Sequence, residues 1–214
     1  QGKLILASDH DVLQVYGRPK EKARELGNEL QCSFTDNIDD LVSNADLYIV
    51  AISDSALYSI HNWLQLKKKL VVHTAGSVPM DVHAGVSANY GVLYPLQSLR
   101  KEMHRVAEVP FITNGNTIED RTLISDFAHS LSSMVWPADD EQRFKLHLAA
   151  VFVSNFTNHL YTLTESFCKN QNIDFKALIP LISEVSVRLQ DHSPSLMQTG
   201  PAVRNDLVTV EKHL

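Results

Sequence analysis

The sequence is poor in cysteine, has no excess of basic residues and contains no long apolar run. Only Cys32 and Cys168 are present among its 214 residues, which excludes a disulfide framework and a four-cysteine zinc site and is typical of the reducing cytoplasm. The formal net charge of −6 argues against general binding to nucleic acid or to an anionic membrane, because both need a basic surface. No apolar run approaches the roughly 18 residues of a membrane-spanning helix, so we expect none.

The first two thirds of the chain alternate short apolar runs with amphipathic stretches, a pattern typical of βα units around a mostly parallel sheet. Continuous apolar runs at 47–52 and 70–75 predict strands that are covered on both faces. The remaining elements are expected as strands at 11–17, 91–94, 110–113 and 133–136, and as helices at 19–30, 37–43, 54–66, 80–86 and 118–131.

The pattern becomes helical after Pro137. One long helix is expected from Asp139 to about Asn170, a second one capped by Asp174, and a final one over residues 204–214. The sequence therefore predicts two domains, an α/β domain over residues 1–137 and an all-helical domain over residues 138–214.

The end of the first predicted strand carries Tyr16, Gly17 and Arg18. Open α/β sheets bind ligands at the carboxyl ends of their strands, and a domain that prefers NAD usually ends this strand in Asp or Glu. Here an arginine follows instead, and its planar guanidinium suits the 2′-phosphate of NADP. The alternative is a solvated arginine at the start of a helix.

Two further strand ends are candidates for cofactor binding. Small residues after the strand at 47–52 allow an adenosine or pyrophosphate to approach the backbone, and the following helix N-terminus favours an anion. The alternative there is simple helix capping. A polar cluster with glycine after the strand at 70–75 suits a nicotinamide or a substrate, although its histidine could equally be a core residue. The candidate residues are Ala51, Ile52, Ser53 and Asp54, and His73, Thr74, Ala75, Gly76 and Ser77.

Candidate catalytic side chains are Tyr94, His147 and Asn155. Tyr94 precedes a proline in a rigid turn, with aromatic packing as the alternative reading. His147 and Asn155 lie in the long helix on either side of the apolar stretch 148–153, which we expect to be buried. Such polar residues are either structural hydrogen-bonding groups of a helix bundle or the wall of an active site. His147 is the candidate general acid or base, because histidine titrates near neutral pH, and Tyr94 and Asn155 could orient a substrate.

No metal is expected, because no carboxylate lies at ligand spacing between His147 and His159.

Three segments of the first domain, 46–54, 71–77 and 90–97, resemble bacterial Rossmann-like oxidoreductases, which are grouped with NADP oxidoreductases of the coenzyme-F420-dependent and pyrroline-5-carboxylate-reductase type. Residues 147–161 and 199–204 resemble the helical domain that accompanies them, a domain of unknown function that is similar to the C-terminal part of 6-phosphogluconate dehydrogenase.

The resemblance implies a homodimer formed through the helical domain, with a small-molecule substrate bound between the two domains. It also implies hydride transfer to or from a C–N or C–O bond with NADP, rather than with NAD or coenzyme F420. Several relatives place a Lys and an Asn four residues apart on the first long helix, but the residue four after Lys145 is Ala149. This departure keeps two alternatives open, a nucleotide-binding sensor without turnover and a dimeric scaffold.

None of the eight glycines forms a GxGxxG loop. Lys3 to Ser8 reads as the end of a helix, and the resemblance implies that a first strand and a glycine-rich phosphate loop precede Gln1.

Overall fold

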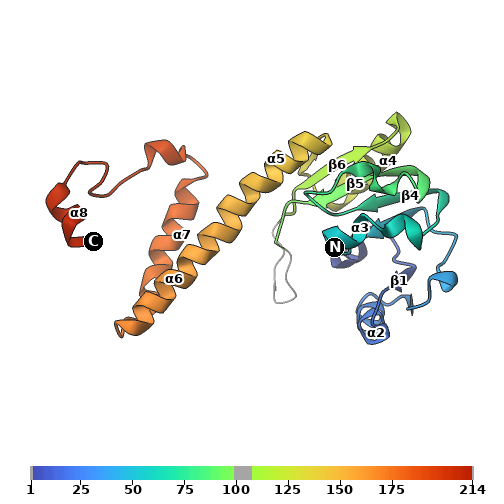
Figure 1. The fold of residues 1–214 in the computed structure, drawn as a ribbon, viewed down its shortest axis with the longest axis horizontal. Coiled ribbons are helices and arrows are strands. Elements are labelled where there is room, and N and C mark those ends of the chain that lie inside the picture. Colours follow the sequence, from blue (N-terminus) through green and yellow to red (C-terminus); the bar gives the residue numbers. More distant parts are fainter. Residues whose placement is uncertain (1, 99–107, 214) are drawn as a thin grey trace. The chain divides into compact units, whose positions relative to one another are not determined.

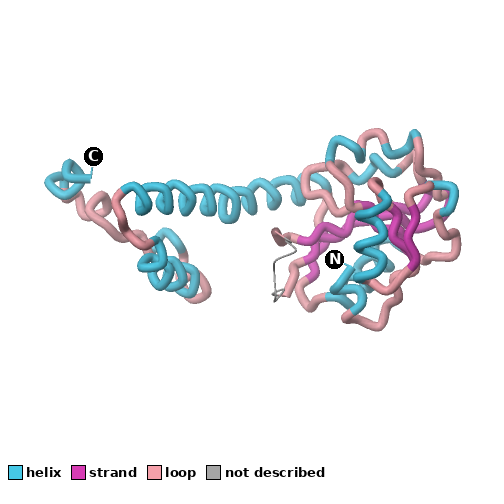
Figure 2. The backbone as a smooth tube through the Cα atoms, turned by 90° about the horizontal axis from the view of Figure 1, so that it is seen from below, coloured by secondary structure: helices cyan, strands magenta, loops and turns pink. Residues whose placement is uncertain are grey.

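The computed structural model describes residues 2–98 and 108–213. By its contacts the chain divides into two compact units, Gln1–Asn155 and Phe156–Leu214. The strands of the described residues all lie in the first unit, and the second contains only helices and loops (Figures 1 and 2). The predicted fold class, a Rossmann-like α/β domain followed by an all-helical part, is confirmed. The expected boundary at residue 137 marks the change in secondary structure, whereas the contacts keep the first turns of the following helix with the sheet.

Five strands form the main sheet, and all neighbours are parallel except one antiparallel pair, β5 with β6. In sheet order, which is also chain order, they are β3 (Leu47–Val50), β4 (Lys67–His73), β5 (Ser87–Pro95), β6 (Phe111–Gly115) and β7 (Val135–Pro137). The expected strands are therefore present, and the sheet is mostly parallel as predicted. One expectation was wrong: β3 is only half-buried over its first three residues, because it lies at the edge of this sheet.

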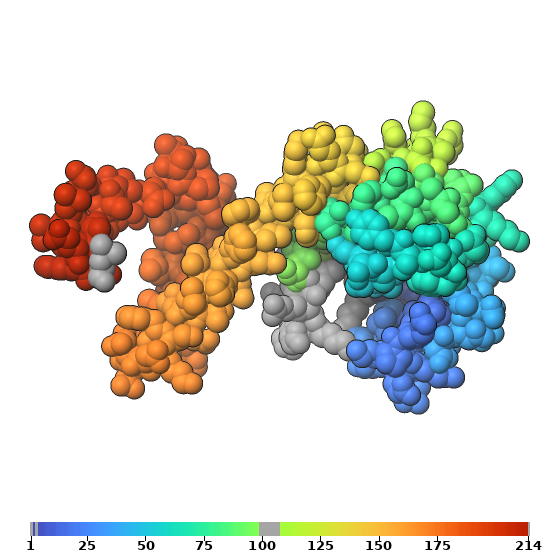
Figure 3. Space-filling view, viewed as in Figure 1, coloured from blue at the N-terminus to red at the C-terminus, as the bar shows by residue number. Residues whose placement is uncertain are grey.

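A separate two-stranded parallel sheet precedes it. It pairs β1 (Gln14–Tyr16) with β2 (Ser33–Thr35) and is packed against α2 (Lys20–Glu29). The ring of Tyr16 lies near that of Trp63, which follows the turn at residues 60–62 and packs against the apolar cluster on one face of the main sheet, with ring centroids 6.2 Å apart, and the two segments are neighbours in Figures 1 and 3. The short strand β2 was not predicted. The helix expected around Lys3 is present as α1 (Gly2–Leu6), and the strand expected ahead of it stays a prediction.

Two apolar clusters cover the two faces of the main sheet, because successive side chains of a strand point to opposite faces. Val71 belongs to one cluster, with α3 (Asp54–Leu57) and the 3-10 turn η2 (Ile60–Asn62). Leu70 and Val72 belong to the other. That second cluster is closed by α4 (Ile118–Leu131), which lies along β5 and β6 as Figure 1 shows. The bounds of α4 agree with the prediction.

Three expected helices are shorter than predicted. The helix expected over 54–66 is broken at Tyr58 and Ser59 into α3 and η2, and the backbone N–H of Ser59 donates to the carbonyl oxygen of Ala56 at 3.3 Å. In a continuing α-helix that N–H would donate to the carbonyl of Ser55 instead. Those expected over 37–43 and 80–86 are single 3-10 turns, η1 (Ile38–Asp40) and η3 (Met80–His83).

The long helix after Asp139 begins with a capping box and continues to Asn170 as predicted, but it is not α-helical throughout. It consists of α5 (Asp140–Ala150), the π-helical η4 (Val151–Phe156) and α6 (Thr157–Asn170). A π-helix has more residues per turn, so faces inferred from a spacing of 3.6 residues do not carry across η4. The expected burial of the apolar stretch was wrong, because Phe152 and Val153 are 63% and 76% exposed.

The remaining elements are short. They are η5 (Phe175–Leu178), α7 (Ile179–Arg188), η6 (Pro194–Leu196) and α8 (Leu207–His213). Within the described residues, no helix combines the length and the apolar character that crossing a bilayer requires.

Candidate functional site

Three strand ends meet at one edge of the main sheet. β3, β4 and β5 are parallel, with Val50 opposite His73 and His73 opposite Val92. The residues that follow β3 and β4, and Tyr94 near the end of β5, therefore lie at the same edge. The structure thus brings together the segments 51–54 and 74–77 and Tyr94.

Tyr94 forms a hydrogen bond with His147, which reaches the same edge from α5. The Tyr94 hydroxyl lies 2.9 Å from His147 Nδ1, and the two rings meet edge to face with centroids 5.9 Å apart. Burial raises the pKa of Tyr94, an effect that the positive charge of Arg143 opposes and the charge of Asp54 supports. The phenol is therefore protonated at neutral pH and can serve as a proton donor to a neighbouring group.

Gly76 provides the space that this pair occupies. A Cβ atom at position 76 would lie 2.6 Å from His147 Nδ1 and 2.8 Å from Tyr94 Cζ, distances that real Cβ atoms do not show. Its lack of a side chain thus serves the packing of Tyr94 and His147, and any larger residue must push the two rings apart.

The ends of β3 and β4 are joined by a hydrogen bond that Ser77 Oγ donates to Asp54 Oδ2. The anion site expected at the following helix N-terminus is not supported, because α3 has only four residues and the Asp54 carboxylate begins it. Ser53 makes no side-chain capping bond. This part of the edge offers a carboxylate and the exposed residues Ala51 and Ile52.

His73 is a buried core residue, the alternative that the sequence left open. Its exposed fraction is 0%, and its Nδ1 accepts the backbone N–H of Ala75 at 3.2 Å. Its ring lies 5.3 Å from that of His83, also 0% exposed. Burial lowers the pKa of His73 to about 3, with further lowering by the charges of His83 and Arg143, and burial lowers the pKa of His83 to about 4. Both rings are neutral at neutral pH.

The end of β1 leaves Arg18 accessible. Gly17 donates its N–H to the carbonyl of Thr35 at 3.1 Å, and the Arg18–Pro19 peptide bond is cis. Arg18 is exposed, and no carboxylate of the described residues lies within salt-bridge distance of it. Its guanidinium is free to meet an anion.

Asn155, the third predicted catalytic residue, is not part of the pair. It is exposed in η4 and has no hydrogen bond to Tyr94 or His147 among the described residues. Two residues that sequence reasoning missed, Asp140 and Arg143, contact the loop after β4 from α5. Arg143 precedes His147 by four residues and so shares its helix face, the signal that could have identified it.

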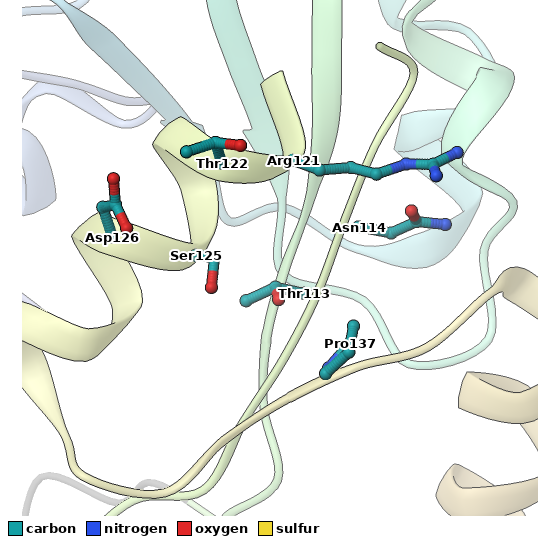
Figure 4. Close-up of a pocket in the computed structure, with 7 residues that line it drawn as sticks. All are labelled: Thr113, Asn114, Arg121, Thr122, Ser125, Asp126 and Pro137. Carbon is teal, nitrogen blue, oxygen red and sulfur yellow. The ribbon is translucent and has the colours of Figure 1, made fainter. Parts of the chain in front are cut away.

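Two cavities of the first unit lie elsewhere. One of about 280 Å³ is formed by β6, α4 and Pro137 and is lined by polar side chains, with Arg121 and Asn114 at one end (Figure 4). A second, mostly apolar one of about 540 Å³ is bordered by β6, β7 and α5. Neither is lined by a predicted site residue, and in the part of the chain that the structure describes no group of three or more potential ligands could hold a metal ion.

The fold and the converging strand ends define the class, a Rossmann-like α/β domain joined to a helical one. Residues 109–214 match the model of a domain of unknown function, DUF2520. A comparison with curated protein sequences finds no match.

Solved structures are similar over nearly the whole chain. The "putative NADP oxidoreductase BF3122 from Bacteroides fragilis" is 38% identical, with a TM-score of 0.90 over 99% of this chain and 83% of its own. Protein TM1727 from Thermotoga maritima is 20% identical, with a TM-score of 0.77 over 94% and 81% of the two chains. The 1-pyrroline-5-carboxylate reductase from Streptococcus pyogenes is 14% identical, with a TM-score of 0.72 over 98% and 85%. The chain belongs to the family of the Bacteroides fragilis protein, and the resemblance to NADP oxidoreductases is confirmed.

The buried histidines predict a loss of stability in acid. An unfolded histidine titrates near pH 6.5, whereas the pKa values of His73 and His83 in the fold are about 3 and about 4. Between these values the unfolded chain binds more protons, so the unfolding free energy falls as the pH falls, by up to about 1.4 kcal/mol per pH unit for each histidine. The stabilisation is complete above about pH 6.5. Urea unfolding between pH 7 and pH 4.5 measures this slope.

His83→Gln removes one of the two titrating groups and should make the slope shallower. His129→Gln, at an exposed position of α4, is the matched control and should leave the slope unchanged. Equal slopes for the wild type and His83→Gln would contradict the assignment of His83 as a buried neutral ring.

Proposed function

We propose that this protein is an NADP-dependent oxidoreductase that transfers a hydride to or from a small molecule at the carboxyl edge of its main sheet. The observation that carries the proposal is the Tyr94–His147 pair at this edge, in a chain 38% identical to the "putative NADP oxidoreductase" of Bacteroides fragilis. Cys32 and Cys168 are free thiols, which supports the cytoplasm as its compartment.

The residues at the strand ends fit a dinucleotide with a 2′-phosphate. Arg18 is exposed at the position where an NAD-specific domain usually has an acidic residue. Its guanidinium can form a bidentate hydrogen bond with a phosphate. Ala51 and Ile52 leave the backbone accessible to the adenosine side. Thr74 and Ser77 lie on the side of the nicotinamide and the substrate. The cofactor supplies the hydride chemistry, and the protein orients it. The fit favours NADP over NAD.

His147 is proposed as the general acid or base. Its Nδ1 is held by the Tyr94 hydroxyl, so a proton that passes to or from the substrate would use Nε2. Tyr94 thereby sets the orientation of the imidazole ring. Asn155 is proposed to orient the substrate from η4, because π-helical segments occur frequently at functional sites.

NADPH should stabilise the full-length protein more than NADH does. A ligand present at one hundred times its dissociation constant adds about 2.7 kcal/mol to the unfolding free energy. Arg18→Gln should remove most of the preference for NADPH, whereas Arg24→Gln, at an exposed position of α2, should keep it. Thermal unfolding with each nucleotide measures both effects. Equal stabilisation by NADH would contradict NADP specificity, and no stabilisation by either would favour the dimeric scaffold.

His147→Ala should abolish turnover and leave NADPH binding intact, because a general acid or base typically contributes about 10² to 10⁴ in rate. NADPH oxidation with a panel of ketones and cyclic imines gives the rate, and thermal unfolding gives the binding. Lys145→Ala, at an exposed position of the same helix, is the control and should keep both. Full turnover in His147→Ala would remove His147 from the mechanism, and NADPH binding without turnover of any substrate by the wild type would favour the sensor.

The helical unit is proposed to associate with a second copy of itself. Cys168 is its one buried residue among those described, whereas apolar side chains such as Leu163 and Phe167 of α6 and Leu181 of α7 are 54% to 61% exposed. So small a core does not stabilise a helical unit of this size, so its apolar surface needs a cover. A second copy offers the same surface and can pair with it by a two-fold axis.

Sedimentation analysis of the full-length protein should therefore show a dimer. Leu163→Glu should shift the equilibrium towards monomer, because it places a charge in the apolar contact. Asn158→Glu, at an exposed polar position on the opposite side of the same helix, should not. A monomeric wild type at micromolar concentration would overturn the association.

A further inference from the structure

Arg143 is an almost fully buried cation. Its side chain is 1% exposed, although it stands on α5 one turn before His147. Long charged side chains are almost never buried unless they are paired, because removing the charge from water is strongly unfavourable. Its partners are Asp140 Oδ1, which accepts from Nη1 at 2.7 Å, and the carbonyl oxygen of Val78, which accepts from Nη2.

The partners of Arg143 connect α5 to the loop that follows β4. The other carboxylate oxygen of Asp140, Oδ2, accepts the backbone N–H of Met80 at 3.0 Å. Arg143 and Asp140 therefore hold the loop at two points, by a carbonyl at Val78 and by an amide at Met80. The two side chains also pair with each other, so each one orients its neighbour.

This loop determines how closely α5 approaches the sheet. Gly76 lies two residues before Val78, and its backbone passes directly beneath the rings of His147 and Tyr94. The room there is so small that a single Cβ atom would overlap both rings. A displacement of the loop towards α5 therefore separates the rings, and a displacement away from α5 removes their support.

Arg143 also acts on the pair through its charge. The guanidinium lowers the pKa of Tyr94, against the effects of burial and of Asp54. The other buried titratable groups of this region, His73 and His83, have pKa values of about 3 and about 4 and are neutral at neutral pH. Asp140 is thus the counter-ion that Arg143 contacts, and it is 41% exposed.

We infer that Arg143 is a positioning residue, which together with Asp140 clamps the loop 76–80 to α5 and so keeps the Tyr94 hydroxyl within hydrogen-bond distance of His147 Nδ1. A role of Arg143 in catalysis rests on the proposed function of the Tyr94–His147 pair. Its effect on the distance between Tyr94 and His147 can be tested without cofactor or substrate.

The experiment measures the coupling between Tyr94 and His147 in two backgrounds. Tyr94→Phe removes the hydroxyl and should lower the urea midpoint of the wild-type protein. In Arg143→Met, which keeps the length and loses the charge and the donors, the same change should have no effect, because the pair is already apart. Lys145→Met, on the same helix and 69% exposed, is the matched control. In that background Tyr94→Phe should lower the urea midpoint by as much as it does in the wild type.

The ring ¹⁵N resonances of His147, assigned by their loss in His147→Gln, give a second readout that general destabilisation does not move. Arg143→Met should shift them to the positions seen in Tyr94→Phe, and Lys145→Met should leave them in place. Arg143→Lys, which keeps the charge but lacks the planar fork of the guanidinium, should shift them part of the way. If Arg143→Met does not fold, Asp140→Asn replaces it, since it removes the charge partner and keeps an acceptor for Met80.

The inference would be overturned if Tyr94→Phe lowered the urea midpoint equally in the wild type and in Arg143→Met and the His147 resonances stayed unchanged. Arg143 would then be a purely structural residue. The proposed function fails separately, by the absence of stabilisation by NADPH.

Discussion

Parallel pairing of β3, β4 and β5 is the constraint on which the site depends. In parallel strands every chain runs the same way, so the residues that leave the strands gather at one edge. The antiparallel β6 leaves its own end at the opposite edge and contributes nothing there. α5, which follows the last strand of the sheet, places His147 beside Tyr94 at this edge. A site made of residues far apart in the chain thus follows from strand direction and one helix.

The close approach of α5 to the loop after β4 buries a charged side chain, which needs partners. A buried guanidinium is unfavourable by itself, and the Asp140 carboxylate and the carbonyl of Val78 compensate for its lost hydration. Gly76 accommodates the approach sterically. The loop after β4, which the sequence suggested as a ligand contact, therefore also packs against the Tyr94–His147 pair. The two roles are compatible, because Thr74 and Ser77 remain partly exposed while Gly76 is buried.

Local sequence patterns predicted most helices and strands well. They did not predict the features that depend on tertiary contacts, such as β2 and the break after α3. α4 could be predicted to the residue because Thr117 caps it and its apolar positions repeat with the helical period. The strand β2 could not, because three residues show no alternation and its stability comes from pairing with β1 and packing under α2. The break after α3 could not either, since Leu57 and Ile60 on its two sides are buried in the same apolar cluster, a tertiary packing that the local pattern does not contain.

By itself the sequence determined the alternation of strands and helices, the change to an all-helical part after Pro137, and the candidates Tyr94, His147 and Arg18, because these depend on period, turn chemistry and residue type. Only the tertiary structure decided that His73 is a core residue and that Tyr94 and His147 meet over Gly76. It alone also showed that Arg143 is buried and that η4 changes the helical register. The physical reason is the same in each case: burial, ion pairing and close approach depend on neighbours that are distant in the chain, and a single sequence does not contain their distances.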